Sequence, residues 1–212
     1  MRYQDLTTIH PIIDQYLNQF LTPGDIAVDA TLGNGNDALK IAKIIGKGGK
    51  LYGFDIQPTA IQNSQERLSS LQEEERPDIE LICDSHAHFE KYIPQKVALI
   101  IYNLGYLPGG DKSITTLPES TLESIKAGLN ILQTYGKILI AVYHGHDTGK
   151  AERDALAEYL ESLDQRYYHV MKQKFINQKN NPPFLYIIEK GRDAEKGRSH
   201  TLWIIVFSPC SH

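Results

Sequence analysis

Short apolar segments rich in β-branched residues alternate along this chain with longer segments in which apolar residues recur every three or four positions. The short segments predict five buried strands: Ile26–Ala30, Lys50–Phe54, Ile79–Cys83, Val97–Tyr102 and Ile138–Tyr143. The longer segments predict five amphipathic helices: His10–Leu21, Asp37–Ile45, Pro58–Leu71, Pro118–Thr134 and Gly149–Leu163. Asn36 is expected to cap the second helix, and Gly46 follows its last residue. This alternation predicts a parallel sheet with helices on both faces.

The pattern changes after Leu163, where two strand-like segments, Tyr168–Ile176 and Phe184–Glu189, follow each other closely. Only residues 177–183 separate them, which is too short for a crossover helix and predicts an antiparallel hairpin. We therefore expect one α/β domain over residues 1–190, built on a seven-stranded, mostly parallel sheet with a C-terminal hairpin. Residues 191–212 are expected to be an appendage, either an extra edge strand or a disordered tail.

The composition agrees with one globular domain and excludes several classes of protein. The chain has 212 residues, of which 41% are hydrophobic, an ordinary fraction for such a domain. Its two cysteines, Cys83 and Cys210, form no C-x-x-C pair, which excludes a disulfide scaffold and a cysteine zinc site. The first residues are polar, unlike a signal peptide, and no apolar run approaches the ~18 residues of a membrane span. We expect a cytoplasmic protein with no membrane partner.

A glycine-containing loop directly follows the first predicted strand, between Asp29 and Asp37. Gly33 and Gly35 allow a tight turn and let a ligand come close to the backbone. The loop lacks the third glycine of a dinucleotide fingerprint, and no Gly-Lys-Ser/Thr follows, which excludes a phosphate-binding P-loop. The carboxylate of Asp29 at the strand end is unfavourable beside a pyrophosphate and favourable beside a cation.

Acidic residues end three successive predicted strands: Asp29, Asp55 and Asp84. Ligands of open α/β sheets bind outside the carboxyl ends of the strands, so these side chains are expected at one site. Asp55, about 20 residues after the glycine loop, can accept both hydroxyls of a ribose. A ligand with a ribose, an adenine amine and a positive charge matches the three carboxylates, and S-adenosylmethionine has all three features. The alternative is that one or two of them only cap the following helices.

Six motifs carry a resemblance to a known family: VDATLGNGND (28–37), GFDIQ (53–57), DSH (84–86), YNLGYLPGGDKSITT (102–116), VYHGH (142–146) and NQKNNPPF (177–184). Through them, the chain from about residue 5 to residue 190 resembles class I S-adenosylmethionine-dependent methyltransferases, and more closely a bacterial family labelled as rRNA methylases. That family includes enzymes that methylate the aminomethyl group of the tRNA wobble uridine. The residues after Lys190 depart from the family pattern.

The resemblance implies a Rossmann-like fold and S-adenosylmethionine as cofactor. It also implies conversion of 5-aminomethyl-(2-thio)uridine to 5-methylaminomethyl-(2-thio)uridine at the tRNA wobble position, with the anticodon loop as partner. The implied cofactor-binding residues are Asp29, Thr31, Gly33, Asn34, Gly35, Asn36, Asp37, Asp55, Ile56, Gln57, Asp84, Ser85, His86 and Asn103. Whether the enzyme forms a homodimer is left open.

The predicted fourth strand ends in NLGY (103–106), which resembles the (Asn/Asp)-Pro-Pro-Tyr motif of amine-methylating enzymes with Leu-Gly in place of the prolines. Methyl transfer is an in-line displacement, so the amine lone pair must lie along the bond between sulfur and the methyl carbon. The amide of Asn103 can accept an amine hydrogen and fix that direction, and the Tyr106 ring can stack on the base. The amine must be neutral to attack, and His144 is the predicted proton acceptor.

Other chemistries are less well supported by the residues. Asp111 and His146 are further candidates for the proton acceptor, although a strand-end histidine is more often only a hydrogen-bonded surface residue. H-x-H occurs at 86–88 and 144–146, but no cysteine or Glu-x-x-His accompanies it, so we expect no metal. The Gly-x-Ser-x-Gly of a serine hydrolase is missing from the sequence.

The net charge of −4 opposes tight nonspecific RNA binding, so any RNA contacts must be local. Lys112, Lys172, Lys174 and Lys179 are the candidate cations. Few phosphate contacts are needed when a pocket recognises one looped-out base. The residues leave open two alternatives: a methyltransferase of rRNA or of a small amine, and a non-catalytic cofactor-binding module on the same fold.

Overall fold

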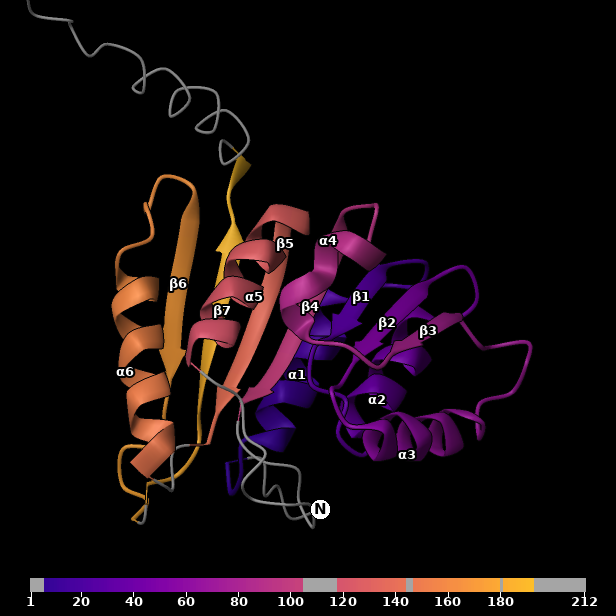
Figure 1. Ribbon diagram of the computed structural model, residues 1–212, viewed down its shortest axis with the longest axis horizontal. Coiled ribbons are helices and arrows are strands. Elements are labelled where there is room, and N and C mark those ends of the chain that lie inside the picture. The colour runs from indigo at the N-terminus through magenta and orange to yellow at the C-terminus, as the bar shows by residue number, and fades with distance from the viewer. Residues whose placement is uncertain (1–5, 105–117, 144–146, 180, 193–212) are drawn as a thin grey trace, which may run out of the picture.

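The computed structural model describes residues 6–104, 118–143, 147–179 and 181–192 (Figure 1). The strands are β1 (Ile26–Asp29), β2 (Lys50–Phe54), β3 (Asp78–Ile82), β4 (Val97–Leu104), β5 (Leu132–Val142), β6 (Tyr168–Gln173) and β7 (Phe184–Lys190). The helices are α1 (His10–Phe20), α2 (Asn36–Ile45), α3 (Pro58–Leu68), the 3₁₀ turn η1 (His86–His88), α4 (Phe89–Tyr92), α5 (Pro118–Ile131) and α6 (Asp147–Glu161).

All seven strands belong to one sheet, in the order β3-β2-β1-β4-β5-β7-β6. The first five strands in sequence pair in parallel, whereas β7 pairs antiparallel with both β5 and β6. The chain moves outward from β1 to β3 and then returns to the other side of β1 with β4. The carboxyl ends of β1 and β4 therefore form the switch point at which ligands of such sheets bind. This is the expected Rossmann-like fold with its C-terminal hairpin.

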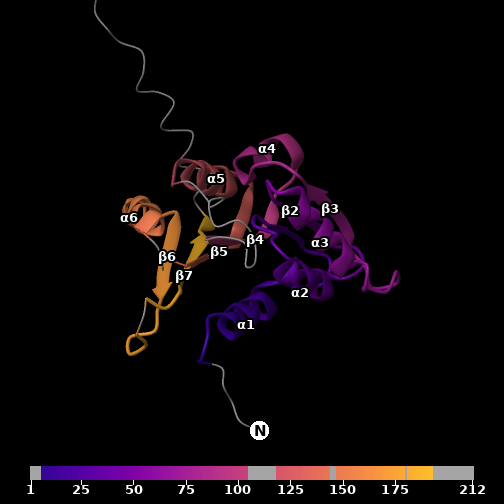
Figure 2. The same cartoon turned by 60° about the horizontal axis from the view of Figure 1, so that its bottom comes forward.

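Helices cover both faces of the sheet, with α1, α2 and α3 on one face and α4, α5 and α6 on the other (Figure 2). Because side chains alternate along a strand, β4 contributes to both hydrophobic clusters. Leu99 and Ile101 pack on the side of α1 and α2, whereas Ile100 and Tyr102 pack on the side of α5. The same alternation directs the next side chain, Asn103, to the side of α2.

The structure corrects two details of the expected elements. Asn36 does not cap α2, because the capping position belongs to Gly35, with a left-handed φ of 72°, and Asn36 is already helical. β5 begins at Leu132, well before Ile138, because Leu132 pairs with Val97 before a register shift between these two strands. The short segments η1 and α4 were not predicted, since neither is long enough to show a helical period.

Part of the predicted organisation lies outside the described residues. Residues 193–212 are not described, so the appendage and a domain boundary at residue 190 stay predictions. In the described ranges, the structure contains no helix with the length and hydrophobicity needed to cross a bilayer. The same ranges hold no group of three or more His, Cys, Asp or Glu side chains that could bind a metal ion.

Candidate active site

The loop between β1 and α2 holds two glycines in the left-handed conformation, with φ of 52° at Gly33 and 72° at Gly35. A Cβ atom at Gly35 would lie 2.9 Å from both Cα and Oγ of Ser64, a buried residue of α3. The Ser64 hydroxyl in turn donates a hydrogen bond to the Gly33 carbonyl, at 3.4 Å. The loop therefore packs closely on α3, and position 35 requires glycine for both its conformation and its size.

Asp55, directly after β2, joins this loop to the second strand. Its Oδ2 accepts the backbone N–H of Gly33 at 3.0 Å, and its Oδ1 accepts the backbone N–H of Gln57 at 2.9 Å. A carboxylate oxygen can accept two hydrogen bonds, so each of these oxygens keeps a lone pair for ligand hydroxyls. The adjacent side chain, Ile56, is 56% exposed and leaves an apolar surface beside the carboxylate.

Asp29, the last residue of β1, is a buried carboxyl group with an unsatisfied oxygen. Its Oδ1 accepts the backbone N–H of Thr31 at 3.1 Å, whereas its buried Oδ2 has no hydrogen-bond partner among the described residues. Burial raises the pKa of Asp29 to about 8, and the carboxylates of Asp37 and Asp55 add to the rise. A buried anion of this kind is costly without a partner, so the site favours a proton or a cationic group at Asp29.

Asn103, near the end of β4, is held in place through both its backbone and its side chain. Its backbone N–H donates to the hydroxyl of Thr31 at 2.7 Å, and its Nδ2 donates to Oδ2 of Asp37 at 2.9 Å. The remaining amide atom, Oδ1, accepts no hydrogen bond from the described part of the chain. The side chain is thus fixed with a free acceptor at the carboxyl edge of the sheet.

Further residues hold Asp37 itself. It lies in the first turn of α2, is 7% exposed, and contacts the Lys40 ammonium at 3.2 Å. Lys40 also contacts Asp14 of α1 at 2.5 Å. Burial raises the pKa of Tyr143 to about 12, and the nearby Asp37 carboxylate contributes to that rise. A network from α1 through α2 therefore orients the amide of Asn103.

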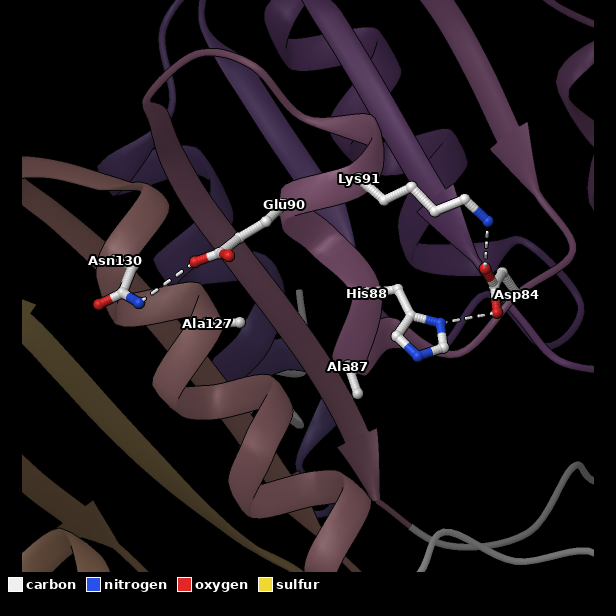
Figure 3. Close-up of a pocket in the computed structure, with 7 residues that line it drawn as sticks. All are labelled: Asp84, Ala87, His88, Glu90, Lys91, Ala127 and Asn130. Carbon is white, nitrogen blue, oxygen red and sulfur yellow. Dashed lines mark hydrogen bonds and ion pairs between the residues drawn. The ribbon is translucent and has the colours of Figure 1, made fainter.

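Asp84, after β3, is bound to η1 and to the last residue of α4. Tyr92 donates to Oδ2 at 2.8 Å, and Oδ1 contacts Nδ1 of His88 at 2.9 Å and accepts the N–H of Ser85 at 2.7 Å. These bonds, that of Tyr92 first, hold the pKa of the Asp84 carboxyl well below its usual range. Figure 3 shows Asp84 beside a surface pocket between α4 and α5, with the Lys91 ammonium 3.5 Å from Oδ2. No described contact joins Asp84 to the glycine loop.

His86 and Ser85 have structural partners in the same region. Ser85 accepts the backbone N–H of Ala87 at 3.2 Å and so caps η1. The His86 ring packs edge-on against Tyr102, with centroids 5.8 Å apart, and its buried Nδ1 has no partner among the described residues. Burial lowers the pKa of His86 to about 4, so this ring is neutral near pH 7.

The structure brings together some of the predicted site residues. Those that meet around the glycine loop and the end of β4 are Asp29, Thr31, Gly33, Asp37, Asp55, Gln57 and Asn103. Asn34 bonds instead to α3, because its carbonyl accepts from Arg67 at 2.6 Å and its side chain accepts from Asn63 at 3.1 Å. Two predicted catalytic residues, Tyr106 and His144, lie outside the described residues.

Asp111, Lys112 and His146 also lie outside the described residues. Sequence reasoning missed Lys40, Asp14 and Tyr143 in the network around Asp37. The i, i+3 spacing of Asp37 and Lys40 was the one available signal.

Comparisons with known proteins agree with this geometry. A putative rRNA methylase from Clostridium thermocellum superposes with a TM-score of 0.83 at 40% identity, over 87% of this chain and 98% of that one. A putative methyltransferase from Streptococcus mutans, in complex with SAH, has a TM-score of 0.77 at 36% identity, over 87% and 99% of the two chains.

A chloroplastic tRNA (mnm(5)s(2)U34)-methyltransferase of Arabidopsis thaliana is 33% identical over 180 residues. This alignment spans 81% of the present chain and 66% of the plant protein, just under two thirds of its length.

The fold, the glycine loop and these relatives together define an S-adenosylmethionine-dependent methyltransferase. Within that class, the chain belongs to the family described as Putative rRNA methylase, whose model matches residues 51–189.

Proposed function

We propose that this enzyme methylates the aminomethyl nitrogen of 5-aminomethyl-(2-thio)uridine at the wobble position of tRNA. The observation that carries the proposal is the fixed amide of Asn103, whose free Oδ1 lies at the carboxyl edge beside the glycine loop. The choice of tRNA as substrate draws on the plant relative, which is named for the modified uridine at position 34. The expected cytoplasmic location stays a prediction, since that relative is chloroplastic.

The residues around the glycine loop fit S-adenosylmethionine. The unsatisfied Oδ2 of Asp29 suits a cationic group, and the lone pairs left on Asp55 suit ribose hydroxyls. The exposed side chain of Ile56 offers an apolar surface for the adenine. When bound, the cofactor supplies a methyl group activated by a sulfonium. Asp84 and His86 remain predicted contacts, although their described partners belong to α4 and β4.

The chain's own residues orient the substrate in this mechanism. Oδ1 of Asn103 accepts one hydrogen of the neutral amine and aims its lone pair at the methyl carbon. The nitrogen–carbon bond forms as the carbon–sulfur bond breaks, the electron pair stays on sulfur, and the extra proton leaves the new ammonium for a base or for water. Asp37 acts as a positioning residue, because it holds Nδ2 and thereby fixes which amide atom faces the amine. Tyr106 and His144 keep their predicted roles as stacking ring and proton acceptor.

The test is nucleoside mass spectrometry on tRNA from a strain that accumulates the unmethylated aminomethyl nucleoside. Incubation with purified protein and S-adenosylmethionine should convert it to the methylaminomethyl nucleoside. Ribosomal RNA and a free alkylamine serve as competing substrates in the same assay. Methylation of either competitor, without any methylation of tRNA, would overturn the tRNA assignment. Cofactor binding without turnover on all three substrates would favour a non-catalytic module.

A further inference from the structure

One stretch of the chain has a charge opposite to that of the whole molecule. Residues 165–188 contain four of the chain's 22 basic side chains and none of its 26 acidic ones, although the net charge is −4. Three of the four are Lys172, Lys174 and Lys179, while the fourth, Arg166, is engaged by Asp164 at 2.6 Å. This basic stretch comprises the residues just before β6, β6 itself, the connection to β7 and most of β7.

The sheet places this connection at the same edge as the candidate active site. Asn103 of β4 pairs with Ala141 of β5, Ala141 pairs with Leu185 of β7, and Leu185 pairs with Gln173 of β6. These four residues form one row across the sheet. Neighbouring strands lie about 4.8 Å apart, so the row places Gln173 roughly 14 Å from Asn103. Lys172 and Lys174 flank Gln173 in sequence, so their backbone lies at about the same distance from Asn103. The Lys172 side chain points to the α5 side of the sheet, where Phe184 and Tyr186 lie, whereas the Asn103 side chain points to the side of α2.

The three lysines are exposed and available to an external anion. None of them forms an ion pair with an acidic side chain in the described part of the chain. The Lys172 ammonium lies 4.1 Å from the ring centroid of Phe184 and 5.1 Å from that of Tyr186, two side chains on the same face of β7. These rings hold the Lys172 stem against the sheet and leave its charge uncompensated.

We propose that Lys172, Lys174 and Lys179, here called the hairpin lysines, bind the backbone phosphates of the RNA strand that flanks the methylated base. This proposal rests on the proposed function and adds a docking surface to it. The anion must be extended, because the lysines lie beside different parts of the chain. Gln178, next to Lys179, donates to the carbonyls of Leu6 and Thr7, whereas Lys172 lies over the rings of β7. A single RNA strand running from the end of β4 across the sheet edge meets this requirement. Amide side chains at Asn177 and Asn181 offer further hydrogen bonds to phosphate or sugar.

The acidic remainder of the molecule explains why such a surface matters. A protein of negative net charge repels RNA at a distance, and only a local cationic surface can orient the strand before the base enters the site. Contacts to phosphates position an RNA without reading its sequence. The hairpin lysines should therefore contribute affinity and orientation, whereas the choice of base should depend on the region around Asn103.

The test compares two triple variants with the same change of charge. One is Lys172→Gln/Lys174→Gln/Lys179→Gln. The control is Lys43→Gln/Lys47→Gln/Arg76→Gln, three exposed residues near the C-terminal end of α2 and before β3, at the opposite edge of the sheet. Binding of a fluorescent anticodon stem-loop RNA is measured from 50 to 300 mM salt. Calorimetry with S-adenosylhomocysteine checks that each variant keeps its cofactor site.

The hairpin variant should bind the RNA about 10-fold or more weakly at low salt. The magnitude of its negative slope of log K against log salt should decrease by about 2, as expected for three lost single-strand contacts. The control should bind like the wild type, and all three proteins should bind S-adenosylhomocysteine equally. Equal RNA binding by both variants would overturn the docking surface. The same conclusion would follow if polyglutamate bound as tightly as RNA and lost the same affinity in the hairpin variant. Failure of the proposed function would give a different result. The wild-type protein would bind tRNA, but nucleoside mass spectrometry would find no methylated product.

Discussion

At the scale of single residues, the site depends on how one amide is oriented. Asn103 donates through Nδ2 to Asp37 and keeps Oδ1 free. Without a partner, an asparagine side chain could equally adopt the flipped orientation, in which Nδ2 and Oδ1 exchange places. The carboxylate accepts hydrogen bonds only, so it selects the orientation with nitrogen toward α2. Lys40, which is itself paired with Asp14, then holds the carboxylate. Asp37 therefore determines which atom of the Asn103 amide is left as a hydrogen-bond acceptor.

Replacement of Asn103 by alanine should remove the acceptor that orients the amine. We expect kcat to fall about 100-fold or more, within the range that positioning supplies, while the Kd for S-adenosylmethionine changes less than threefold. Single-turnover methylation and calorimetry measure the two quantities. Asn103→Asp, which keeps an oxygen at this position but faces Asp37, should be similarly impaired by repulsion. A kcat close to that of the wild type in Asn103→Ala would exclude Asn103 from the mechanism.

Replacement of Asp37 by asparagine should weaken the choice between the two amide orientations. We expect kcat to fall roughly 10-fold with little change in the KM for tRNA, and this loss should vanish in an Asn103→Ala background, because the two residues act as one unit. Steady-state kinetics of the double-mutant cycle is the measurement, with Asp14→Asn as the milder control. Additive losses would show that Asp37 acts independently of Asn103.

At the scale of elements, the sheet edge depends on a close contact between the glycine loop and α3. The backbone of Gly35 approaches Ser64 so closely that a side chain has no room, and the loop then presents Gly33 to Asp55. The glycine loop, α3 and the end of β2 thus form one packed unit. A change in the loop backbone should move all three.

Gly35→Ala combines a strained left-handed residue with a collision against α3, so we expect a loss of about 2–4 kcal/mol in the free energy of unfolding and at least 10-fold weaker cofactor binding. Gly48→Ala is the matched control, because Gly48 has a φ of 92° and nothing within 4 Å of the added Cβ. It should lose only about 1 kcal/mol and keep cofactor affinity. Urea unfolding and calorimetry measure both quantities. Equal effects of the two substitutions would contradict the role of the contact with Ser64.

At the scale of the whole molecule, we expect Asp29 to make both stability and cofactor binding depend on pH. Its pKa of about 8 in the folded protein lies above the ordinary aspartate value of 3.8. Between those values the folded protein keeps a proton that the unfolded chain has lost. The free energy of unfolding therefore decreases as the pH rises through this window, by at most about 1.4 kcal/mol per pH unit, and the decrease ends above pH 8.

Asp29→Asn removes this titration. Relative to the variant, the wild-type protein without cofactor should lose about 3 °C in melting temperature per pH unit between pH 5 and pH 8. Comparison with the variant cancels other groups such as His86, whose lowered pKa has the opposite effect in the acidic range. S-adenosylmethionine should bind the wild type more tightly as the pH approaches 8, since the ionised carboxylate receives its positive charge, and the variant should lack this gain. Parallel melting curves for the two proteins would refute the coupling.

The fold and part of the site were predictable because they follow from local patterns. Buried strands and amphipathic helices leave periodic apolar positions, and the short link before Phe184 allows only a hairpin. The positions of Asp29 and Asp55 at strand ends follow from the same pattern. The cap of α2 was mispredicted, because asparagine is a favoured capping residue but the left-handed backbone at Gly35 displaced it by one position.

The sequence by itself determined the order of strands and helices, the glycine loop and the carboxylates that follow the strands, because each depends on neighbouring residues. Only the tertiary structure decided how those groups are used. Asp84 turned toward Tyr92 and His88, Asp29 was left with an unsatisfied oxygen, and Asp37 became the partner of Asn103, 66 positions away. These outcomes depend on which strand ends and helices meet in space, since a buried polar group takes the partner that packing brings within about 3 Å.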